Sequence, residues 1–430
     1  MPTFLLQELR KIRSRILTLA KDTPLQTLIR IKRGLLARFA NNGVHQNGFQ
    51  DFSTYLLRAQ GKEGPVFAES NDFSESGIRS TLARLKEIVP NPTSSTERSS
   101  KEKIYDSSVK EYFSFSLERI PETARAAIEE AVQLIRPAKA SANGYFSAYE
   151  RFFYLCDSTG FEAFHPATAF RFGVTLTKGA GRGYLSFYHP DSRKLRVTPV
   201  VREAMQLAEE ASRGEITLES GPYECIFSPR AFLELIEPLR RHFDRRFTEG
   251  GRSVFSGVCG KKVFSDEFTL TDDIGHPGQF GVPFDAEGYP KKKVALVTGG
   301  ILKELLAEGH STRGILEHPF YPQNLVVEKG NLSLKDLFRC IRRGIYINKI
   351  WYHTLVRESE MEVTGLATAG SVYIERGKIK GRVVHLRYHD SLFSILNSVV
   401  GTSREQILLK DGEMGAALFP YVWVSSLKIV

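Results

Sequence analysis

Apolar residues recur along the first half of the chain at the spacings of both helices and strands. Three- and four-residue spacing predicts helices, whereas alternation and dense apolar runs bounded by turn residues predict strands. Helices are predicted over residues 4–21, from Ser74 onward, and over 121–137 and 199–212. Strands are predicted over residues 25–39, 52–59, 144–156 and 168–188. This mixture predicts an α/β N-terminal domain that spans residues 1–214.

The pattern changes after Arg213-Gly214-Glu215. One helix is predicted from Ser228 to Phe243, with Ser228-Pro229 as its N-cap and first turn. A second, short helix is predicted over 333–343, and the remainder consists of short strands separated by Gly, Asp-Asp and Pro turns. We therefore predict an α+β protein whose second domain, residues 215–430, is mostly antiparallel β and barrel-like.

One stretch of this second domain, residues 283–331, combines short apolar runs with many polar groups. An acidic turn at Asp285–Gly288 precedes a strand from Lys293 to Thr298, and a polar loop at 309–312 precedes another strand at 324–328. Charged and hydroxyl side chains on loops of a β scaffold are typical of a functional surface. We expect this stretch to form such a surface.

Composition limits the class of protein. The chain has 430 residues, enough for two domains. No apolar run approaches the length of a membrane span, and Arg and Lys interrupt the first 20 residues, which excludes a signal-peptide core. The four cysteines are far apart and form no C-x-x-C pair, so we expect buried free thiols and a cytoplasmic protein.

The chain carries a formal net charge of +10 and a pI of about 9.3. A basic balance is compatible with nucleic acid, an anionic membrane or an acidic partner. A solvated basic surface is the favoured interpretation, because no nucleic-acid motif accompanies the charge. The basic N-terminal helix is compatible with a membrane surface, but packing on a sheet is favoured.

Candidate catalytic motifs are incomplete. The Gly-rich run Lys178–Gly183 lacks the helix that a phosphate loop needs, so a hairpin turn is predicted. The run Gly309–Gly314 is one residue too long for a nucleophile elbow. The carboxylate pairs fit turns better than acid–base catalysis; these pairs are Asp266/Glu267, Asp272/Asp273 and Asp285/Glu287.

Metal ligands are also missing at the spacings that a zinc helix requires. None of the ten histidines belongs to an H-E-x-x-H or H-E-x-x-x-H motif, in which two imidazoles on one helix face reach one ion. We therefore predict no catalytic and no metal-binding residue in this chain.

Short motifs in a fixed order connect the chain to a known family. In the second half they are Thr269-Leu270-x-Asp272-Asp273, Phe284-Asp285-x-Glu287-Gly288, Gly299-Gly300-Ile301-Leu302-Lys303, His310-Ser311-Thr312-x-Gly314 and Pro322-x-Asn324. Weaker landmarks in the first half include Glu69-Ser70-Asn71-Asp72-Phe73 and Leu155-x-Asp157-Ser158-x-Gly160. In this order and spacing, the chain resembles the TldD/TldE (PmbA) metalloprotease family over nearly its whole length.

The resemblance implies a two-domain subunit of a dimeric peptidase. In that family, TldD-type subunits carry an H-E-x-x-x-H zinc helix and a C-terminal Cys-Gly, and TldE-type subunits lack the zinc motif. The corresponding positions here are the helix at Ser228–Arg246 and Asp411-Gly412, neither of which has those residues. The chain is thus most similar to the TldE/PmbA type, which implies zinc in a TldD-type partner and none in this chain.

Such a subunit is expected to form cavity walls that hold an extended peptide or unfolded polypeptide by strand addition. The predicted substrate-lining residues are Asp285, Glu287, Gly288, His310, Ser311, Thr312 and Asn324. No membrane partner is expected, and nucleic acid is not favoured. Two alternatives stay open: a regulatory protein of the gyrase-modulator type without peptidase activity, and an autonomous hydrolase that uses Ser311 or the carboxylates.

Overall fold

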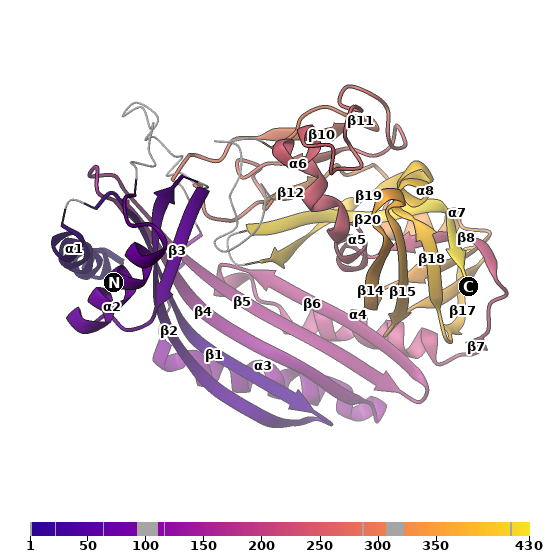
Figure 1. Cartoon of the computed structure of the whole chain (residues 1–430). Helices are drawn as coiled ribbons and strands as arrows, with labels where there is room; N and C mark the ends of the chain where they lie inside the picture. The colour runs from indigo at the N-terminus through magenta and orange to yellow at the C-terminus, as the bar shows by residue number, and fades with distance from the viewer. Residues whose placement is uncertain are drawn as a thin grey trace.

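The computed structural model describes residues 2–21, 23–62, 64–92, 111–115, 117–285, 288–306, 322–412 and 415–430. Two β-sheets organise these residues: a long tilted sheet from the N-terminal half and a second sheet above it from the C-terminal half (Figure 1). Within the described ranges, no helix is both long and apolar enough to cross a membrane.

The N-terminal sheet has six strands in the order β3-β2-β1-β4-β5-β6, and all of its neighbouring strands are antiparallel. The strands are β1 (Gln26–Ala40), β2 (Gly43–Gly61), β3 (Gly64–Ser70), β4 (Ser141–Asp157), β5 (Glu162–Lys178) and β6 (Gly181–His189). The strand predictions are confirmed, and the segment 168–188 proves to be part of a hairpin that turns between Lys178 and Gly181.

Four helices cover one face of this sheet: α1 (Pro2–Ala20), α2 (Glu75–Ile88), α3 (Ile120–Ile135) and α4 (Val197–Ala211). Residues alternate between the two faces of a strand, so Ile29 and Leu35 of β1 point the same way. Ile29 packs with α1 and α2, and Leu35 packs with α3 and α4. The basic N-terminal helix is therefore packed against this sheet, as favoured from its sequence, with Leu9 buried.

The other face of the sheet, here called the helix-free face, is aromatic and basic. Cross-strand pairs share a face, and the pairs Lys32–Arg151 and Arg171–Tyr188 lie on it. One end of this face packs against the C-terminal half, because Phe153 belongs to the same apolar cluster as Phe284. The helix-free face therefore lies between the two sheets (Figure 1).

The C-terminal sheet has 14 strands, and most of its pairs are antiparallel. They are β7 (Glu215–Ile216), β8 (Gly221–Phe227), β9 (Leu270–Asp272), β10 (Val294–Thr298), β11 (Ile301–Leu302), β12 (Leu325–Val327), β13 (Arg343–Ile347), β14 (Lys349–Arg357), β15 (Glu362–Thr368), β16 (Val372–Glu375), β17 (Lys378–Val383), β18 (Arg387–Ser391), β19 (Val399–Asp411) and β20 (Gly415–Ile429). Strand β20 pairs with β8, β12, β18 and β19, which places it centrally.

These two sheets confirm the predicted α+β class with a mostly antiparallel second half. The change of sheet falls between His189, where β6 ends, and Glu215, where β7 begins. The predicted division into domains 1–214 and 215–430 stays a prediction.

The predicted single helix from Ser228 to Phe243 is wrong. The segment forms α5 (Pro229–Leu235), a 3-10 helix (Glu237–Phe243) and then α6 (Arg245–Glu249). Pro238 explains the break, because proline has no N–H to donate to the carbonyl four residues earlier and disfavours α geometry just before it. The predicted N-cap is confirmed: Ser228 Oγ accepts a hydrogen bond from Ala231 N at 3.1 Å. The other helices of this half are α7 (Leu334–Cys340) and α8 (Leu392–Asn397).

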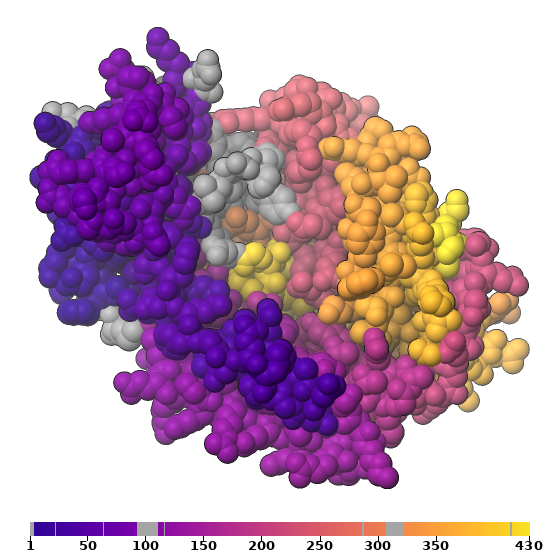
Figure 2. Space-filling view, turned by 60° about the horizontal axis from the view of Figure 1, so that its bottom comes forward, coloured from indigo at the N-terminus to yellow at the C-terminus, as the bar shows by residue number. Residues whose placement is uncertain are grey.

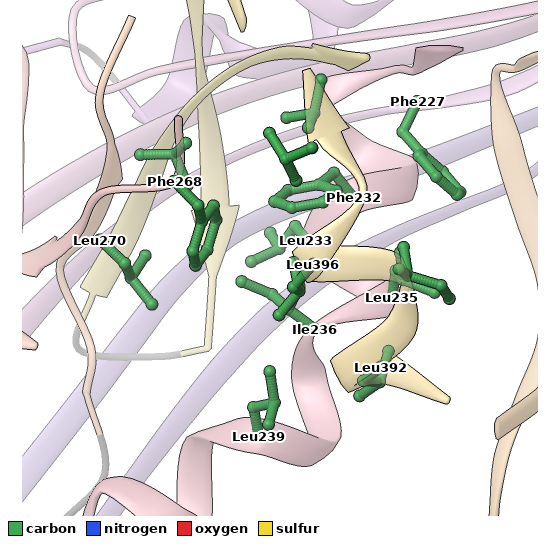
Figure 3. Packing of buried hydrophobic residues seen from close by; sticks show 14 of the residues in the cluster. Phe227, Phe232, Leu233, Leu235, Ile236, Leu239, Phe268, Leu270, Leu392 and Leu396 are labelled. Atoms are coloured by element: carbon green, nitrogen blue, oxygen red, sulfur yellow. The ribbon is translucent and has the colours of Figure 1, made fainter. Parts of the chain in front are cut away.

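Helix α5 is fixed by the largest apolar core. Phe232 is fully buried, and its ring centroid lies 6.1 Å from those of Phe227, Phe268 and Phe419. Figure 3 shows Phe232 between Phe268 and Phe227, with Leu396 of α8 nearby. Such aromatic packing holds α5 rigidly, so its polar side is presented in a defined direction.

All four cysteines are free thiols. Cys156 and Cys225 are buried, as expected, but Cys259 and Cys340 are exposed. The expectation of buried thiols is therefore wrong for the latter two.

Candidate functional site

A cleft of about 430 Å³ lies beside the polar side of α5. Its walls come from α5 and the following 3-10 helix, from β14 and from the end of β19. The polar and aromatic residues that line it are Arg230, Glu234, Glu237, Trp351, His353, Lys410 and Asp411. The space-filling view shows a hollow between orange atoms of the C-terminal half and purple and indigo atoms of the N-terminal half, with yellow atoms visible inside it (Figure 2).

The charged groups of the cleft are paired with one another. Arg230 Nε lies 2.8 Å from Glu234 Oε1, one helical turn further along α5. Arg240 is buried beneath them and pairs with Glu237 at 3.2 Å and with Asp411. These pairs fix the orientation of the cleft's carboxylates.

The cleft has one histidine, on β14. His353 Nδ1 is 2.8 Å from the hydroxyl of Tyr388, and burial lowers the pKa of His353 to about 4. This imidazole is therefore neutral at physiological pH.

The residues of this cleft do not fit a zinc ion. Zinc sites in proteins combine three or four donors from His, Cys, Asp and Glu. The described residues contain no group of three or more such side chains that could hold a metal. In addition, the Arg230 guanidinium lines the cleft, and a positive group repels a dication. We therefore derive no chemical step through a metal bound by this chain.

Beneath the cleft, three cationic side chains surround a smaller cavity of about 50 Å³. We call Arg171, Arg230 and Lys410 the cationic collar. They come from β5, α5 and β19, so both halves of the protein contribute to it. Tyrosines complete the wall, and the Arg171 guanidinium lies 5.4 Å from the centre of the Tyr145 ring.

Beyond the collar lies an apolar chamber of about 340 Å³. It lies between two sets of elements: α4 and β6 of the N-terminal half, and α5, β13, β19 and β20 of the C-terminal half. Its apolar and aromatic walls include Phe187, Val200, Pro229, Ile407, Leu409 and Tyr421. Ligand sites in proteins are often apolar concavities of this size with a few convergent polar groups.

A buried network of charges anchors the collar. Burial lowers the pKa of Lys410 to about 7, although Glu111 opposes this effect. Burial alone would raise the pKa of Glu111, but the hydrogen bond from His165 at 3.1 Å and the charge of Lys410 hold it below its ordinary value. The Tyr188 hydroxyl also donates to Glu111 at 3.3 Å. Lys410 is thus held in place by groups from the N-terminal half.

Three of the predicted substrate-lining residues lie in the described part of the chain. Asp285 is buried, and its Oδ1 accepts a hydrogen bond from Tyr289 N at 2.9 Å, which closes a tight loop. Gly288 in that loop has a φ of 87°, a conformation that glycine adopts readily. Asn324 is fully buried, and its side-chain amide donates to Phe280 O at 3.1 Å.

Asp285 and Asn324 are brought together by Lys291. Lys291 Nζ lies 3.3 Å from Asn324 Oδ1, and burial lowers the pKa of Lys291 to about 8 against the opposing charges of Asp272 and Asp285. Neither residue, nor Gly288, lines any of the three cavities above. The other predicted lining residues, Glu287, His310, Ser311 and Thr312, lie outside the described residues.

Sequence reasoning missed the collar. Arg171, Arg230 and Lys410 are far apart in the chain, and each stands among apolar residues that predict an ordinary strand or helix. A basic residue inside such an apolar segment could have pointed to the collar, because lysine and arginine are seldom buried without a partner or a role. Their convergence depends on how the two sheets pack.

Known proteins share features with this chain. Residues 220–430 match the family described as PmbA/TldA metallopeptidase C-terminal domain. An uncharacterized protein of Methanocaldococcus jannaschii is 25% identical over 201 residues, which are 43% of this chain and 46% of that protein. A metalloprotease TldD homolog of Buchnera aphidicola is 26% identical over 188 residues, which are 39% of this chain and 38% of that protein. The matches thus span less than half the length of these relatives.

Solved structures resemble nearly the whole chain. The crystal structure of TldE from Thermococcus kodakarensis has a TM-score of 0.83 at 18% identity and covers 97% of this chain and 100% of its own. A proposed modulator of DNA gyrase from Thermotoga maritima has a TM-score of 0.80 at 16% identity and covers 98% of this chain and 100% of its own. At such low identity the likeness shows the fold.

Proposed function

Because this chain belongs to the TldD/TldE (PmbA) metallopeptidase family, we propose that it acts as the non-metal subunit of a heterodimeric zinc peptidase. In this proposal a TldD-type partner supplies the zinc, and this chain supplies walls of the substrate cavity. The observation that carries the proposal is the set of side chains in the cleft: an Arg230–Glu234 ion pair lies on α5, within the segment Ser228–Arg246 that the resemblance matches to the zinc helix.

Strand β14 supports a role in holding peptides. Among the described strands, β14 pairs only with β15, so its other edge is available for hydrogen bonding. Trp351 at its start lines the cleft and is 74% exposed, and Tyr352 and Val356 are also exposed. An open strand edge with exposed apolar side chains is suited to bind an extended chain through main-chain hydrogen bonds, with little dependence on sequence.

The proposed partner explains how peptides would be cut. Zinc in a peptidase activates a water molecule and polarises the scissile carbonyl. The residues of this chain would position the peptide: β14 binds its backbone, and Arg230 and Lys410 provide positive charge beside it. The free thiols are consistent with a cytoplasmic location for such a complex, since disulfides are rare there.

Reconstitution tests the proposal. Mixing this chain with a TldD-type chain that contains H-E-x-x-x-H should give a heterodimer on size-exclusion chromatography, with one zinc per pair by elemental analysis. Peptidase activity should require both chains and disappear with chelator. Separate elution of the two chains would reject the proposal.

A point substitution makes the same test specific. We expect Trp351→Glu to weaken peptide hydrolysis by the reconstituted pair at least about tenfold, because a buried or stacked aromatic contact is replaced by a charge. Val44→Glu is the matched control, since Val44 on β2 is also an exposed apolar residue, 52% accessible, and lines none of the three cavities. Equal activity of both variants would show that β14 does not bind the peptide.

The regulatory alternative is favoured by one observation, the net charge of +10. It predicts that the isolated chain binds duplex DNA with an affinity that falls steeply as salt increases. Weak binding that does not depend on salt would exclude it.

A further inference from the structure

We propose that the cationic collar binds the terminal α-carboxylate of a peptide whose last side chain, an apolar one, occupies the apolar chamber. This inference rests on the proposed peptide-holding function and adds a substrate class to it: chains with a free, apolar C-terminus.

The three cavities adjoin one another and share lining residues. Arg230 lines the cleft, the collar cavity and the chamber. Lys410 lines the cleft and the collar cavity, and Leu409 lines the collar cavity and the chamber. A peptide end that enters along β14 therefore meets the positive charges first and the apolar walls beyond them.

Arg171 is the least neutralised member of the collar. Its side chain is half-buried, and no carboxylate in the described part of the chain forms an ion pair with it. Its Nη2 donates a hydrogen bond to Tyr145 OH at 3.5 Å. The Tyr145 ring lies against Gly173 of β5, where a Cβ would come within 2.5 Å of the ring. Glycine at position 173 thus leaves room for the Tyr145 ring that supports Arg171.

The collar suits a carboxylate better than an uncharged ligand. A guanidinium presents two parallel N–H groups to the two oxygens of a carboxylate, and such charge-assisted pairs are strong when partly buried. Arg230 and Arg171 approach the cavity from opposite halves of the protein, and Lys410 adds a third donor. Its existing hydrogen bond to Gly415 O, at 2.6 Å, fixes the ammonium in place.

The chamber suits an apolar side chain, because its wall is mostly apolar and several of its polar groups already have partners. Tyr346 OH donates to Asn348 Oδ1 at 3.0 Å, and Ser228 Oγ donates to Asn348 O at 2.6 Å. Glu203 is the carboxylate in its lining, and burial raises the pKa of Glu203. The test therefore compares a peptide that ends in a basic residue with one that ends in an apolar residue.

Calorimetric titration of the isolated full chain tests the inference. The probes are acetyl-Ala-Ala-Ala-Phe as the free acid, the same peptide as its C-terminal amide, and acetyl-Ala-Ala-Ala-Lys as the free acid. The Phe acid should bind at least about tenfold more tightly than its amide, since the amide cannot accept two charge-assisted hydrogen bonds. It should also bind more tightly than the Lys acid.

Substitutions assign the effect to the collar. Arg171→Gln should reduce the preference for acid over amide to less than about threefold, and Arg171→Lys should keep part of it. Arg171 is suited to this test because its removal leaves no carboxylate unpaired among the described residues. Arg136→Gln is the charge-matched control, because Arg136 is exposed at the end of α3, on the opposite side of the sheet. Thermal unfolding verifies that each variant folds.

Equal binding of acid and amide, or no binding of either peptide, would overturn the inference, and so would an acid preference that survives Arg171→Gln. Tighter binding of the Lys acid than of the Phe acid would overturn the assignment of the chamber to an apolar side chain. These outcomes are independent of zinc and of the partner chain. Failure of the reconstitution above would instead reject the proposed function.

Discussion

Lys410 illustrates how one residue depends on both halves of the protein. Its ammonium is buried at the end of β19, yet three of the four charged groups that act on it, Glu111, Arg151 and Arg171, belong to the N-terminal half, and the fourth is Asp411. Burial of a lysine is unfavourable unless opposite charge is nearby. The lowered pKa of about 7 shows that burial outweighs the attraction of Glu111.

This balance predicts a pH dependence of stability. In the unfolded chain Lys410 is protonated up to about pH 10.4, whereas in the folded protein it loses its proton near 7. The unfolded state therefore binds more protons above pH 7, so the free energy of unfolding should rise with pH there.

The comparison with Lys410→Met isolates this contribution. Between pH 7 and 9 the free energy of unfolding of the wild-type protein should rise relative to that of Lys410→Met, by at most about 1.4 kcal/mol per pH unit. Urea unfolding at both pH values measures it. Lys86→Met, at an exposed position of α2, is the control and should parallel the wild type. If the free energy of unfolding of Lys410→Met changed with pH as that of the wild type does, the prediction would be contradicted.

At the scale of elements, helix α5 joins the core to the cleft. One side carries Phe232 into the aromatic cluster, and the other carries Arg230 and Glu234 into the cleft. Its rotation about its own axis is thus set by apolar packing, which determines where the charged pair points.

Truncation of the Phe232 side chain should destabilise the folded protein. We expect Phe232→Ala to lower the free energy of unfolding by about 3–5 kcal/mol, because it leaves a cavity in a close-packed core. Chemical unfolding followed by tryptophan fluorescence provides the measurement. Phe52→Ala on β2 is the control, since that ring is 52% exposed and its loss should cost less than about 0.5 kcal/mol. Equal effects would show that Phe232 is not a core anchor.

The sequence predicted long elements better than local breaks. Strands such as β4 and helices such as α3 follow from periodicity that extends over many residues. The break after Leu235 was missed because the apolar pattern continues through Leu239 and Phe243, which remain buried in a 3-10 helix. Pro238 overrides that pattern locally. The cavities were also unpredictable, because their walls come from segments that meet only after the sheets pack.

At the scale of the molecule, the two halves meet through both apolar and charged contacts. Phe284 and Val282 of the C-terminal half pack with Leu28, Leu56 and Phe153 of the helix-free face. Nearby, Lys410 approaches Glu111. The apolar contact fixes the spacing that the charged contact requires.

Phe284→Ala should therefore loosen the junction. We expect a loss of about 3–5 kcal/mol if the halves unfold together, and faster amide hydrogen exchange in β1 and β4 near Leu28 and Phe153. Hydrogen exchange detected by mass spectrometry measures this locally. Val430→Ala, at an exposed apolar residue, is the control. Unchanged exchange at the junction would indicate that the Phe284 side chain is not needed to hold the halves together there.

The position of β20 has a consequence for synthesis on the ribosome. The N-terminal sheet has all its strands once residue 189 has been made, so it can fold early. The C-terminal sheet needs residues 415–429 at its centre, where they pair with β8 and β12, which are made long before. Nascent chains therefore carry unpaired edges of β8 and β12 until a late stage of translation, and such edges are prone to mispairing. This half of the protein is the one expected to depend on chaperones during its production.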